Sequence, residues 1–291
     1  MSHRRALALM VLVTLLWSTA GVVSRQLESA RSFEVTFWRS AFTFLALVLW
    51  WGLREGRAGL APLLRPTCLL WASAVCWALM FTAFMLALTM STVANVLVVM
   101  SLAPLFTALL SWLLLGQRLS LVSLASVVMA GAGVAWMFTG DALNFSWGPV
   151  IALIVPVAAA LNWVLLQSQT QTAPVNKPDL THAVALGALL SAVAALPFAL
   201  PFHASGSDLA WLALLGTTQL ALPCVLLVSL TRHLSATEIS LLALLELIFG
   251  IVWVWWLAGE VPSTRTLGGG AMVLVALILN EIRKPLPSIR V

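Results

Sequence analysis

Long apolar runs, each about 20 residues, follow one another along the whole chain with short polar connections between them. A helical run of that length crosses the hydrocarbon core of a bilayer. The pattern predicts ten membrane spans, at residues 6–24, 33–53, 67–89, 92–114, 119–138, 147–168, 182–200, 210–230, 237–257 and 265–282. The division between the third and fourth spans is the weakest, because only Met90, Ser91 and Thr92 separate them. We therefore expect an all-α membrane protein.

The composition supports this expectation. Of the 291 residues, 62% are hydrophobic and 9% are charged, which leaves too little polar surface to cover a soluble core. The net charge of +5 comes from basic residues scattered singly or in pairs near span ends, a pattern that does not indicate nucleic-acid binding. The first run is long enough to span, and no clear small-residue cleavage site follows it, so we interpret it as a span.

The basic residues also predict an orientation. With the N-terminus inside, eleven Lys and Arg residues fall in the inner segments and three in the outer segments. Cytoplasmic segments of membrane proteins carry such an excess of Lys and Arg. We therefore expect both termini in the cytoplasm and the protein in an inner (plasma) membrane.

An internal repeat links the two halves of the chain. Residues 103–117 align with residues 246–260 at a constant offset. The matched pairs include Phe106 with Phe249, Trp112 with Trp255, and Gly116 with Gly259. Five spans per half is an odd number, so residues 1–143 and 144–291 are predicted to form two inverted five-helix repeats. Secondary transporters typically have such repeats and bind substrate near the midplane between them.

Several motifs resemble a known family. They are Leu16-Trp17-Ser18-Thr19, Trp38-Arg39, Leu102-Ala103-Pro104-Leu105 and Leu245-Glu246-Leu247. With them the chain resembles the drug/metabolite transporter superfamily, specifically its ten-helix EamA-type carriers, and looks most like the aromatic amino acid exporters. The resemblance implies a basket of helices around a central cavity that opens alternately to each side. Leu247 stands where the family usually has proline, so of these two repeat-related positions we expect a proline hinge only at Pro104, in the first half.

The candidate substrate-binding residues are aromatic or polar groups within the spans. They are Trp17, Trp77, Phe81, Asn162, Trp163, Gln219 and Glu246. The rings would offer stacking and apolar surface, and the polar groups would hold α-amino and carboxylate groups. The structural alternative is that the uncharged polar groups bridge helices and that the tryptophans pack in the bundle. For Glu246 the alternatives are proton coupling, a ligand for a substrate amine, or a structural polar contact.

Arg39 and two glycine clusters also leave alternatives. Arg39 lies about two turns into its span, where it can snorkel, pair with an acid or carbonyl, or bind a substrate carboxylate. Residues 130–133 and 268–270 are rich in glycine and fall in repeat-related spans. Small residues let helices approach closely, so we expect these clusters to pack the scaffold.

The sequence contains no enzyme constellation. The three cysteines lack metal-ligand spacing, no nucleophile–base pair lies in a span, and no phosphate-binding loop precedes a Lys-Ser/Thr pair. We expect no enzyme activity, cofactor or metal. The leading hypothesis is secondary export of amino acids, aromatic or otherwise apolar. The alternatives are export of lipophilic cations, drugs or another small metabolite, with Glu246 as counter-charge, and a channel or membrane enzyme. The expected partners are a small-molecule substrate and the lipid bilayer, not nucleic acid, and the oligomeric state is not predicted.

Overall fold

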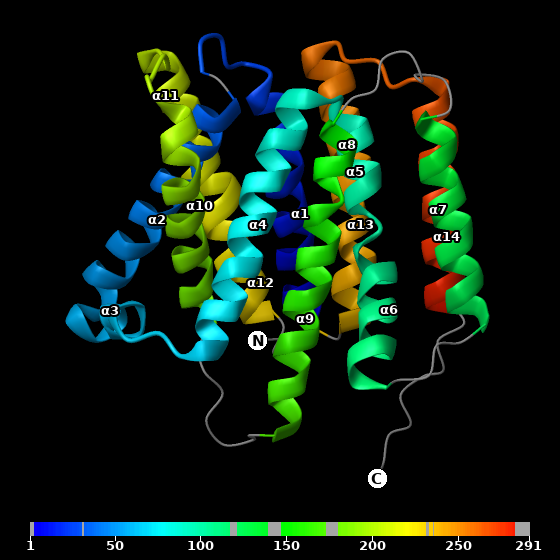
Figure 1. Ribbon diagram of the computed structural model, residues 1–291, viewed down its shortest axis with the longest axis horizontal. Coiled ribbons are helices and arrows are strands. Elements are labelled where there is room, and N and C mark those ends of the chain that lie inside the picture. Colours follow the sequence, from blue (N-terminus) through cyan, green and yellow to red (C-terminus); the bar gives the residue numbers. More distant parts are fainter. Residues whose placement is uncertain are drawn as a thin grey trace.

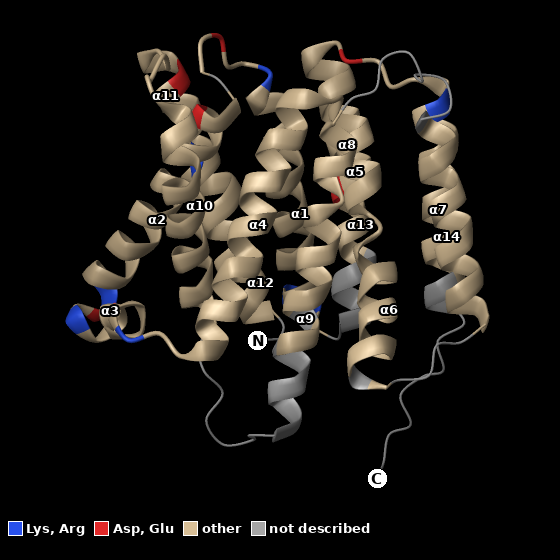
Figure 2. Cartoon of the chain, viewed as in Figure 1, with Lys and Arg blue, Asp and Glu red and all other residues tan. Residues whose placement is uncertain are grey.

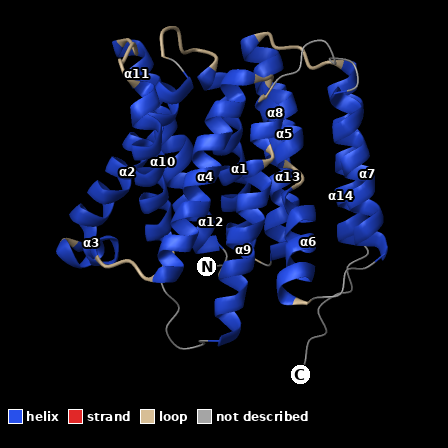
Figure 3. Cartoon of the chain, in the orientation of Figure 1, coloured by secondary structure: helices blue, strands red, loops and turns tan. Residues whose placement is uncertain are grey.

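The structure is a computed structural model that describes residues 3–30, 32–116, 121–138, 147–172, 180–230, 233–234 and 236–282. In this part of the chain, helices are joined by loops and turns (Figure 3). The first half contains α1 (His3–Ser24), α2 (Ser32–Glu55), α3 (Arg57–Leu64), α4 (Cys68–Met90), α5 (Val93–Met100), α6 (Ala103–Leu115) and α7 (Leu121–Phe138). The second half contains α8 (Gly148–Ala152), α9 (Ile154–Thr172), α10 (Thr181–Ala199), α11 (Gly206–Leu214), η1 (Leu215–Ala221), α12 (Leu222–Leu230), α13 (Ala236–Ala258) and α14 (Thr264–Ile282).

These helices run side by side as a bundle (Figure 1). The start of α1 and the end of α14 lie at the same end of the bundle, which we call the N-terminal end. The other end, where α1 leads into α2, is called the opposite end.

Several helical segments have the length and hydropathy of membrane spans. Six are long and apolar enough to cross a bilayer, namely His3–Ser24, Ser32–Glu55, Cys68–Met90, Val93–Leu114, Thr181–Ala199 and Gly206–Leu230. Shorter apolar helices cover Leu121–Met137, Gly148–Asn162, Leu242–Ala258 and Thr264–Leu279. Each of these segments overlaps one of the predicted spans. The described chain is therefore an all-helical, multi-pass membrane protein.

The expected division between the third and fourth spans is confirmed. Helix α4 ends at Met90 and α5 begins at Val93, and the Thr92 hydroxyl caps α5 by accepting an N–H three residues further on. The fourth span then breaks between α5 and α6, directly before Pro104. Proline lacks an N–H and fits the first turn of a new helix. Helix α13 runs unbroken past Leu247, so the expected contrast between the two halves is confirmed.

Four features differ from the expected spans. The short helix α3 was not predicted, and the sixth span divides at Leu153 into α8 and α9. The eighth span begins at Gly206 rather than at residue 210, because Ser205 and Asp208 form a capping box that starts α11. That span also contains a π-helical turn, η1, between α11 and α12. Such turns occur mostly as single insertions in α-helices and are frequent at functional sites.

Two repeat-related glycines end their helices in the same way. Gly116 follows α6 and Gly259 follows α13, with φ angles of 65° and 67°. A left-handed residue ends many helices, and glycine adopts this conformation without a steric penalty.

The helix contacts match between the halves. Helix α7 packs on α14 and α2 packs on α10. Helix α1 packs on α13, as α9 packs on α6. The contact of α4 with α9 corresponds to the contact of α12 with α1. The contact of α4 with α10 corresponds to the contact of η1 and α11 with α2. Exchanging the first half for the second leaves this set of contacts unchanged.

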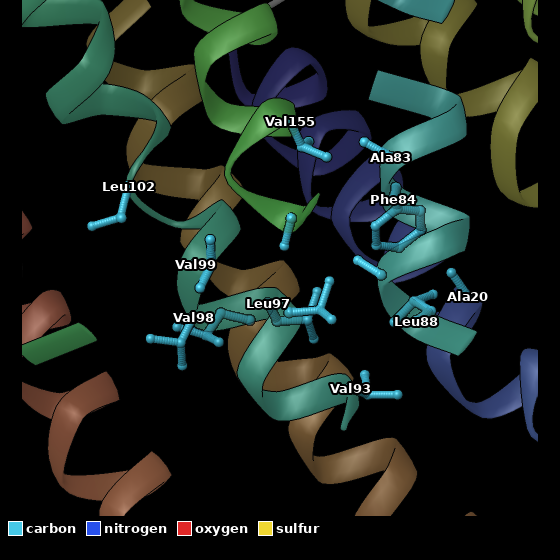
Figure 4. Close-up of a cluster of buried hydrophobic side chains, with 14 of the residues drawn as sticks. Ala20, Ala83, Phe84, Leu88, Val93, Leu97, Val98, Val99, Leu102 and Val155 are labelled. Carbon is cyan, nitrogen blue, oxygen red and sulfur yellow. The ribbon is translucent and has the colours of Figure 1, made fainter. Parts of the chain in front are cut away.

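The main apolar core closes the opposite half of the bundle. In Figure 4, Val93 and Leu97 of α5 face Leu88 of α4, with Ala20 of α1 nearby. All four side chains are buried. A Cβ at Gly21 would lie only 2.5 Å from a methyl group of Val93, so α1 and α5 approach closely here.

Helices α7 and α14 also meet through glycine. A Cβ at Gly133 would lie 2.8 Å from the main-chain oxygen of Gly269, and one at Gly269 would lie 2.4 Å from the oxygen of Gly133. These backbones therefore touch where residues 130–133 meet residues 268–270. The expected packing role of the glycine clusters is confirmed for this pair.

Candidate functional site

Most of the described charged residues lie toward the two ends of the bundle (Figure 2). Among the described residues, Arg39 of α2 and Glu246 of α13 lie well inside their helices. An ionisable group at membrane depth is costly and normally faces the protein interior with a polar partner. The candidate site is therefore built outward from these two residues.

The guanidinium of Arg39 is held along one edge. Its side chain is only 1% exposed, so it does not snorkel to the surface. Nε and Nη2 both donate to Oε1 of Gln219, at 3.3 and 2.8 Å. The Cζ atom lies 5.5 Å from the centre of the Phe84 ring, a cation–π distance. Nη1 is buried and has no acceptor in the described part of the chain.

Gln219 joins three helices. It lies in the π turn η1, is 3% exposed, and donates from Nε2 to the main-chain oxygen of Trp17 at 3.2 Å. Gly216 permits this approach, because a Cβ there would lie 2.6 Å from the main-chain oxygen of Arg39. The hydroxyl of Thr43 donates toward the carbonyl oxygens of Arg39 and Gly216, each at 2.9 Å. The π turn is thus fastened to α2 and α1 around the arginine.

Glu246 lies near this arginine without touching it. The two side chains interact electrostatically, but no ion pair or hydrogen bond joins them in the described residues. The side chain of Glu246 is partly exposed. Cys224 is fully buried, with its thiol against Trp17 and in electrostatic range of both charged groups. Two opposite charges therefore share one region of the bundle while remaining unpaired.

Aromatic rings border the same region. Trp77 and Phe81 of α4 are 8% and 3% exposed, with ring centroids 5.4 Å apart. They belong to a buried cluster that includes residues of α10 and η1, and partly buried Trp17 packs against that cluster. The structure therefore brings together four predicted site residues, Trp17, Trp77, Phe81 and Gln219.

Asn162 is placed beside this group and Trp163 is only partly described. The Asn162 side chain is 1% exposed and its Oδ1 accepts a hydrogen bond of 2.7 Å from Ser73. This bond ties α9 to α4, about one turn from Trp77. In this conformation Asn162 bridges helices, which was the structural alternative. The side chain of Trp163 lies outside the described residues.

Two residues of this region, Arg39 and Phe84, were not among the predicted substrate-binding residues. The sequence left three alternatives for Arg39, and only its burial excludes snorkelling. Phe84 was not considered, although it lies seven residues after Trp77 and so on the same face of α4. That spacing was the available signal.

A second polar cluster fastens the opposite end. Arg25 forms an ion pair of 3.0 Å with Glu260 and donates to the main-chain oxygens of Leu88 and Ser91, each at 2.9 Å. Glu260 also accepts the N–H of Val93 at 2.7 Å. These contacts, which we call the Arg25–Glu260 latch, connect the ends of α1, α4, α5 and α13.

Two buried carboxylates have structural explanations. Asp208, at the start of α11, accepts main-chain N–H groups of residues 28–30 at 3.0–3.1 Å. Glu34, at the start of α2, accepts those of residues 203–204 at 2.8–3.0 Å. The start of α11 thus holds the loop before α2, and the start of α2 holds the loop before α11.

Two cavities lie at the periphery. One, of about 430 Å³, opens between α2, α4, α8 and α10 and is lined by Ser32, Phe33, Leu86, Met90, Ile151 and Phe198. The other, of about 330 Å³, lies between α7 and α14. Neither is lined by a predicted substrate-binding residue.

Comparisons with known proteins agree with this architecture. A transporter of Archaeoglobus fulgidus, described as uncharacterized, is 29% identical over 273 residues, which cover 94% of each chain. A protein of known crystal structure superposes with a TM-score of 0.62 over 96% of each chain, and its 19% identity supports the fold alone. The model of the EamA-like transporter family matches residues 4–139 and again residues 146–281. These two matches cover nearly the whole chain, so the protein belongs to the EamA-like transporter family and is a multi-pass membrane transporter.

Proposed function

We propose that this transporter is a secondary carrier that exports amino acids, aromatic or otherwise apolar, by alternating access. The observation that carries the proposal is the meeting of aromatic rings with two unpaired opposite charges inside the bundle. Arg39 and Glu246 supply the charges, and Trp17, Trp77 and Phe81 supply the rings. An apolar amino acid has the complementary features, namely a carboxylate, an ammonium group and an apolar side chain.

The carrier is proposed to have ten spans in two inverted repeats, residues 1–143 and 144–291. Three observations support this arrangement: the double match of the family model, the helix contacts that survive exchange of the halves, and the equivalent ends at Gly116 and Gly259. The excess of Lys and Arg in alternate connections supports cytoplasmic termini in an inner (plasma) membrane. The opposite end of the bundle is then the external end.

Alternating access is supported by the contacts that close the external end. At the external end, the main apolar core and the Arg25–Glu260 latch hold α1, α4, α5 and α13 together. The break before Pro104 separates α5, which belongs to that closed half, from α6. A broken helix lets its two halves move separately, so the break is a natural place for the motion that opens one end at a time.

Export of lipophilic cations is the second candidate. Glu246 beside aromatic rings is the feature that favours it, since cations bind both carboxylates and π faces. Arg39 weighs against it, because a buried guanidinium would repel a second cation in a region of low dielectric constant. Competition between an amino acid and a quaternary ammonium ion in one assay separates the two candidates.

The proposal is tested by counterflow in proteoliposomes. Proteoliposomes preloaded with unlabelled L-phenylalanine should accumulate the labelled compound in a saturable manner. Parallel measurements with and without a pH gradient should reveal any proton coupling. Absence of counterflow across a panel of amino acids would exclude amino acid export. Saturable exchange would also exclude a channel.

The aromatic part of the site has its own test. Replacing Trp17 by Ala removes a large apolar contact worth about 1–3 kcal/mol, which lowers substrate affinity about fivefold to a hundredfold. Trp50, which is 51% exposed, is the matched control, and Trp50→Ala should transport with wild-type affinity. Normal affinity in Trp17→Ala would remove Trp17 from the binding site.

A further inference from the structure

We propose, on the basis of the proposed function, that the guanidinium of Arg39, held by Gln219, binds the carboxylate of the transported molecule. The proposal assigns a carboxylate subsite to two side chains that are 180 residues apart in the chain. It selects one of the three roles that the sequence left open for Arg39.

The first argument is the mismatch between the burial of Arg39 and its hydrogen bonds. A buried charge is stable when it is paired and all its donors are used. Arg39 is 1% exposed, yet its partner Gln219 is neutral and the donor Nη1 has no acceptor among the described residues. A purely structural arginine would be expected to have an acid or several carbonyl oxygens around it. An anionic ligand would supply a directly bound negative charge and the missing acceptor.

The second argument is the geometry of the free edge. A guanidinium is planar, and its five N–H donors form a fixed fork that matches a carboxylate. Gln219 occupies the edge formed by Nε and Nη2. The end formed by Nη1 and the second hydrogen of Nη2 remains for two parallel bonds to one carboxylate. Because Gln219 holds the fork in place, little side-chain freedom is lost when the ligand binds.

The third argument is the π turn that presents Gln219. The amide of Gln219 is oriented at both ends, since Oε1 accepts from Arg39 and Nε2 donates to the main chain of Trp17. The bond from Gln219 to the main chain of Trp17 connects the guanidinium of Arg39 to α1. We assign the indole of Trp17 to the apolar part of the site. Binding of a carboxylate at Arg39 would therefore be felt by α1, α2 and η1 together.

The position of Glu246 completes the charge pattern. Glu246 interacts electrostatically with Arg39 without a direct ion pair, so its carboxylate does not occupy the hydrogen-bond donors of the guanidinium. A zwitterion can lie between them with its carboxylate at Arg39 and its ammonium group toward Glu246. A molecule without a carboxylate would leave the guanidinium unpaired.

The decisive variant is Gln219→Glu. It places a carboxylate of the protein beside the guanidinium, where it competes with the carboxylate of the ligand. Affinity for L-phenylalanine should fall about 10- to 100-fold, the scale of lost hydrogen bonds to a charged group. Affinity for phenylalaninamide, which lacks the carboxylate, should change little. If the pair were only a helix tie, Gln219→Glu would keep the wild-type preference for L-phenylalanine over its amide.

Two further variants keep the test interpretable. Arg39→Lys keeps the charge but removes the fork, and it should also lose the preference for L-phenylalanine over the amide. Ser191→Ala is the control, because it removes the hydrogen bonds of α10 to Ser40 of α2 and to Thr82 of α4 without touching the arginine. It should keep the wild-type preference. Thermal melting of all variants in detergent identifies any that fail to fold.

The outcomes separate the inference from the proposed function. Wild-type counterflow of L-phenylalanine with a lost preference in Gln219→Glu and Arg39→Lys supports both. Wild-type counterflow with the preference unchanged in folded variants overturns the carboxylate subsite and leaves amino acid export standing. No counterflow of any amino acid by the wild type overturns amino acid export and the subsite that rests on it.

Discussion

Removing the guanidinium of Arg25 is expected to loosen the opposite end of the bundle, which we propose to be the external end. This side chain connects three helix ends through Glu260 and the main-chain oxygens of Leu88 and Ser91. In Arg25→Ala these bonds are lost, and Glu260 keeps only its bond from the N–H of Val93. The closed conformation loses stability, whereas an open conformation, in which the helix ends separate, loses little.

The magnitude follows from the exposure of the groups. The Arg25 and Glu260 side chains are 30% and 17% exposed, so their ion pair is partly screened and contributes about 0.2–1 kcal/mol. Each bond from the guanidinium to a carbonyl oxygen adds about 0.5–1.5 kcal/mol, less where water replaces it. A net loss of about 1–3 kcal/mol shifts the ratio of closed to open molecules about fivefold to a hundredfold.

A cysteine at position 20 provides the assay. Ala20 is 1% exposed in the closed core of α1, so Ala20→Cys should react slowly with a membrane-impermeant maleimide added from outside. Exposed Cys68 is first replaced by Ser, while Cys76 and Cys224 are buried. In the Arg25→Ala background, the labelling rate should rise at least about fivefold, following the shift in population.

The control removes a different arginine from the same end. Arg265 is exposed at the start of α14, outside the latch, and Arg265→Ala should leave labelling at position 20 unchanged. High salt should accelerate labelling in the wild type, because it screens the partly exposed pair. Equal labelling rates in Arg25→Ala and the wild type would refute the idea that the latch keeps this end closed.

Two further predictions concern stability. Gly216→Ala should lower the melting temperature, with about 1–3 kcal/mol of destabilisation, because its Cβ would lie 2.6 Å from the main-chain oxygen of Arg39. Gly131→Ala, where nothing lies within 4 Å, should be neutral or slightly stabilising in the same thermal unfolding assay. Asp208→Asn should destabilise the folded protein by about 1–3 kcal/mol, since the carboxylate accepts four main-chain N–H groups. The control Glu28→Gln changes an exposed side chain and should melt like the wild type.

Local features of the fold were predictable wherever one short segment decides them. The boundary at Thr92 depends on a hydroxyl that caps the next helix, and the break before Pro104 depends on a missing N–H. The early start of α11 was missed because the predicted span began at residue 210, after the polar residue Asp208. Its carboxylate in fact caps α11 and holds the loop between α1 and α2.

The candidate site was predictable as residue types and not as contacts. Trp17, Trp77, Phe81 and Gln219 were selected because aromatic and polar groups are unusual in the middle of apolar spans, and they lie in one region. The role of Arg39 could not be chosen, because snorkelling, pairing and ligand binding require the same residue in the same place along the helix. Its burial decides between them.

The sequence by itself determined that the chain is a membrane protein built from apolar spans, that its halves repeat, and that the fourth span has a proline break which its repeat partner, the ninth span, lacks. Each of these properties depends on composition or on neighbouring residues. Only the tertiary structure decided that Arg39 meets Gln219 and that Arg25 meets Glu260, across 180 and 235 residues. The physical reason is that spans in a bilayer are apolar on every side, so the hydrophobic pattern does not mark which face is buried. Rotation and register of the packed helices set that face, and with it the partners of every polar group.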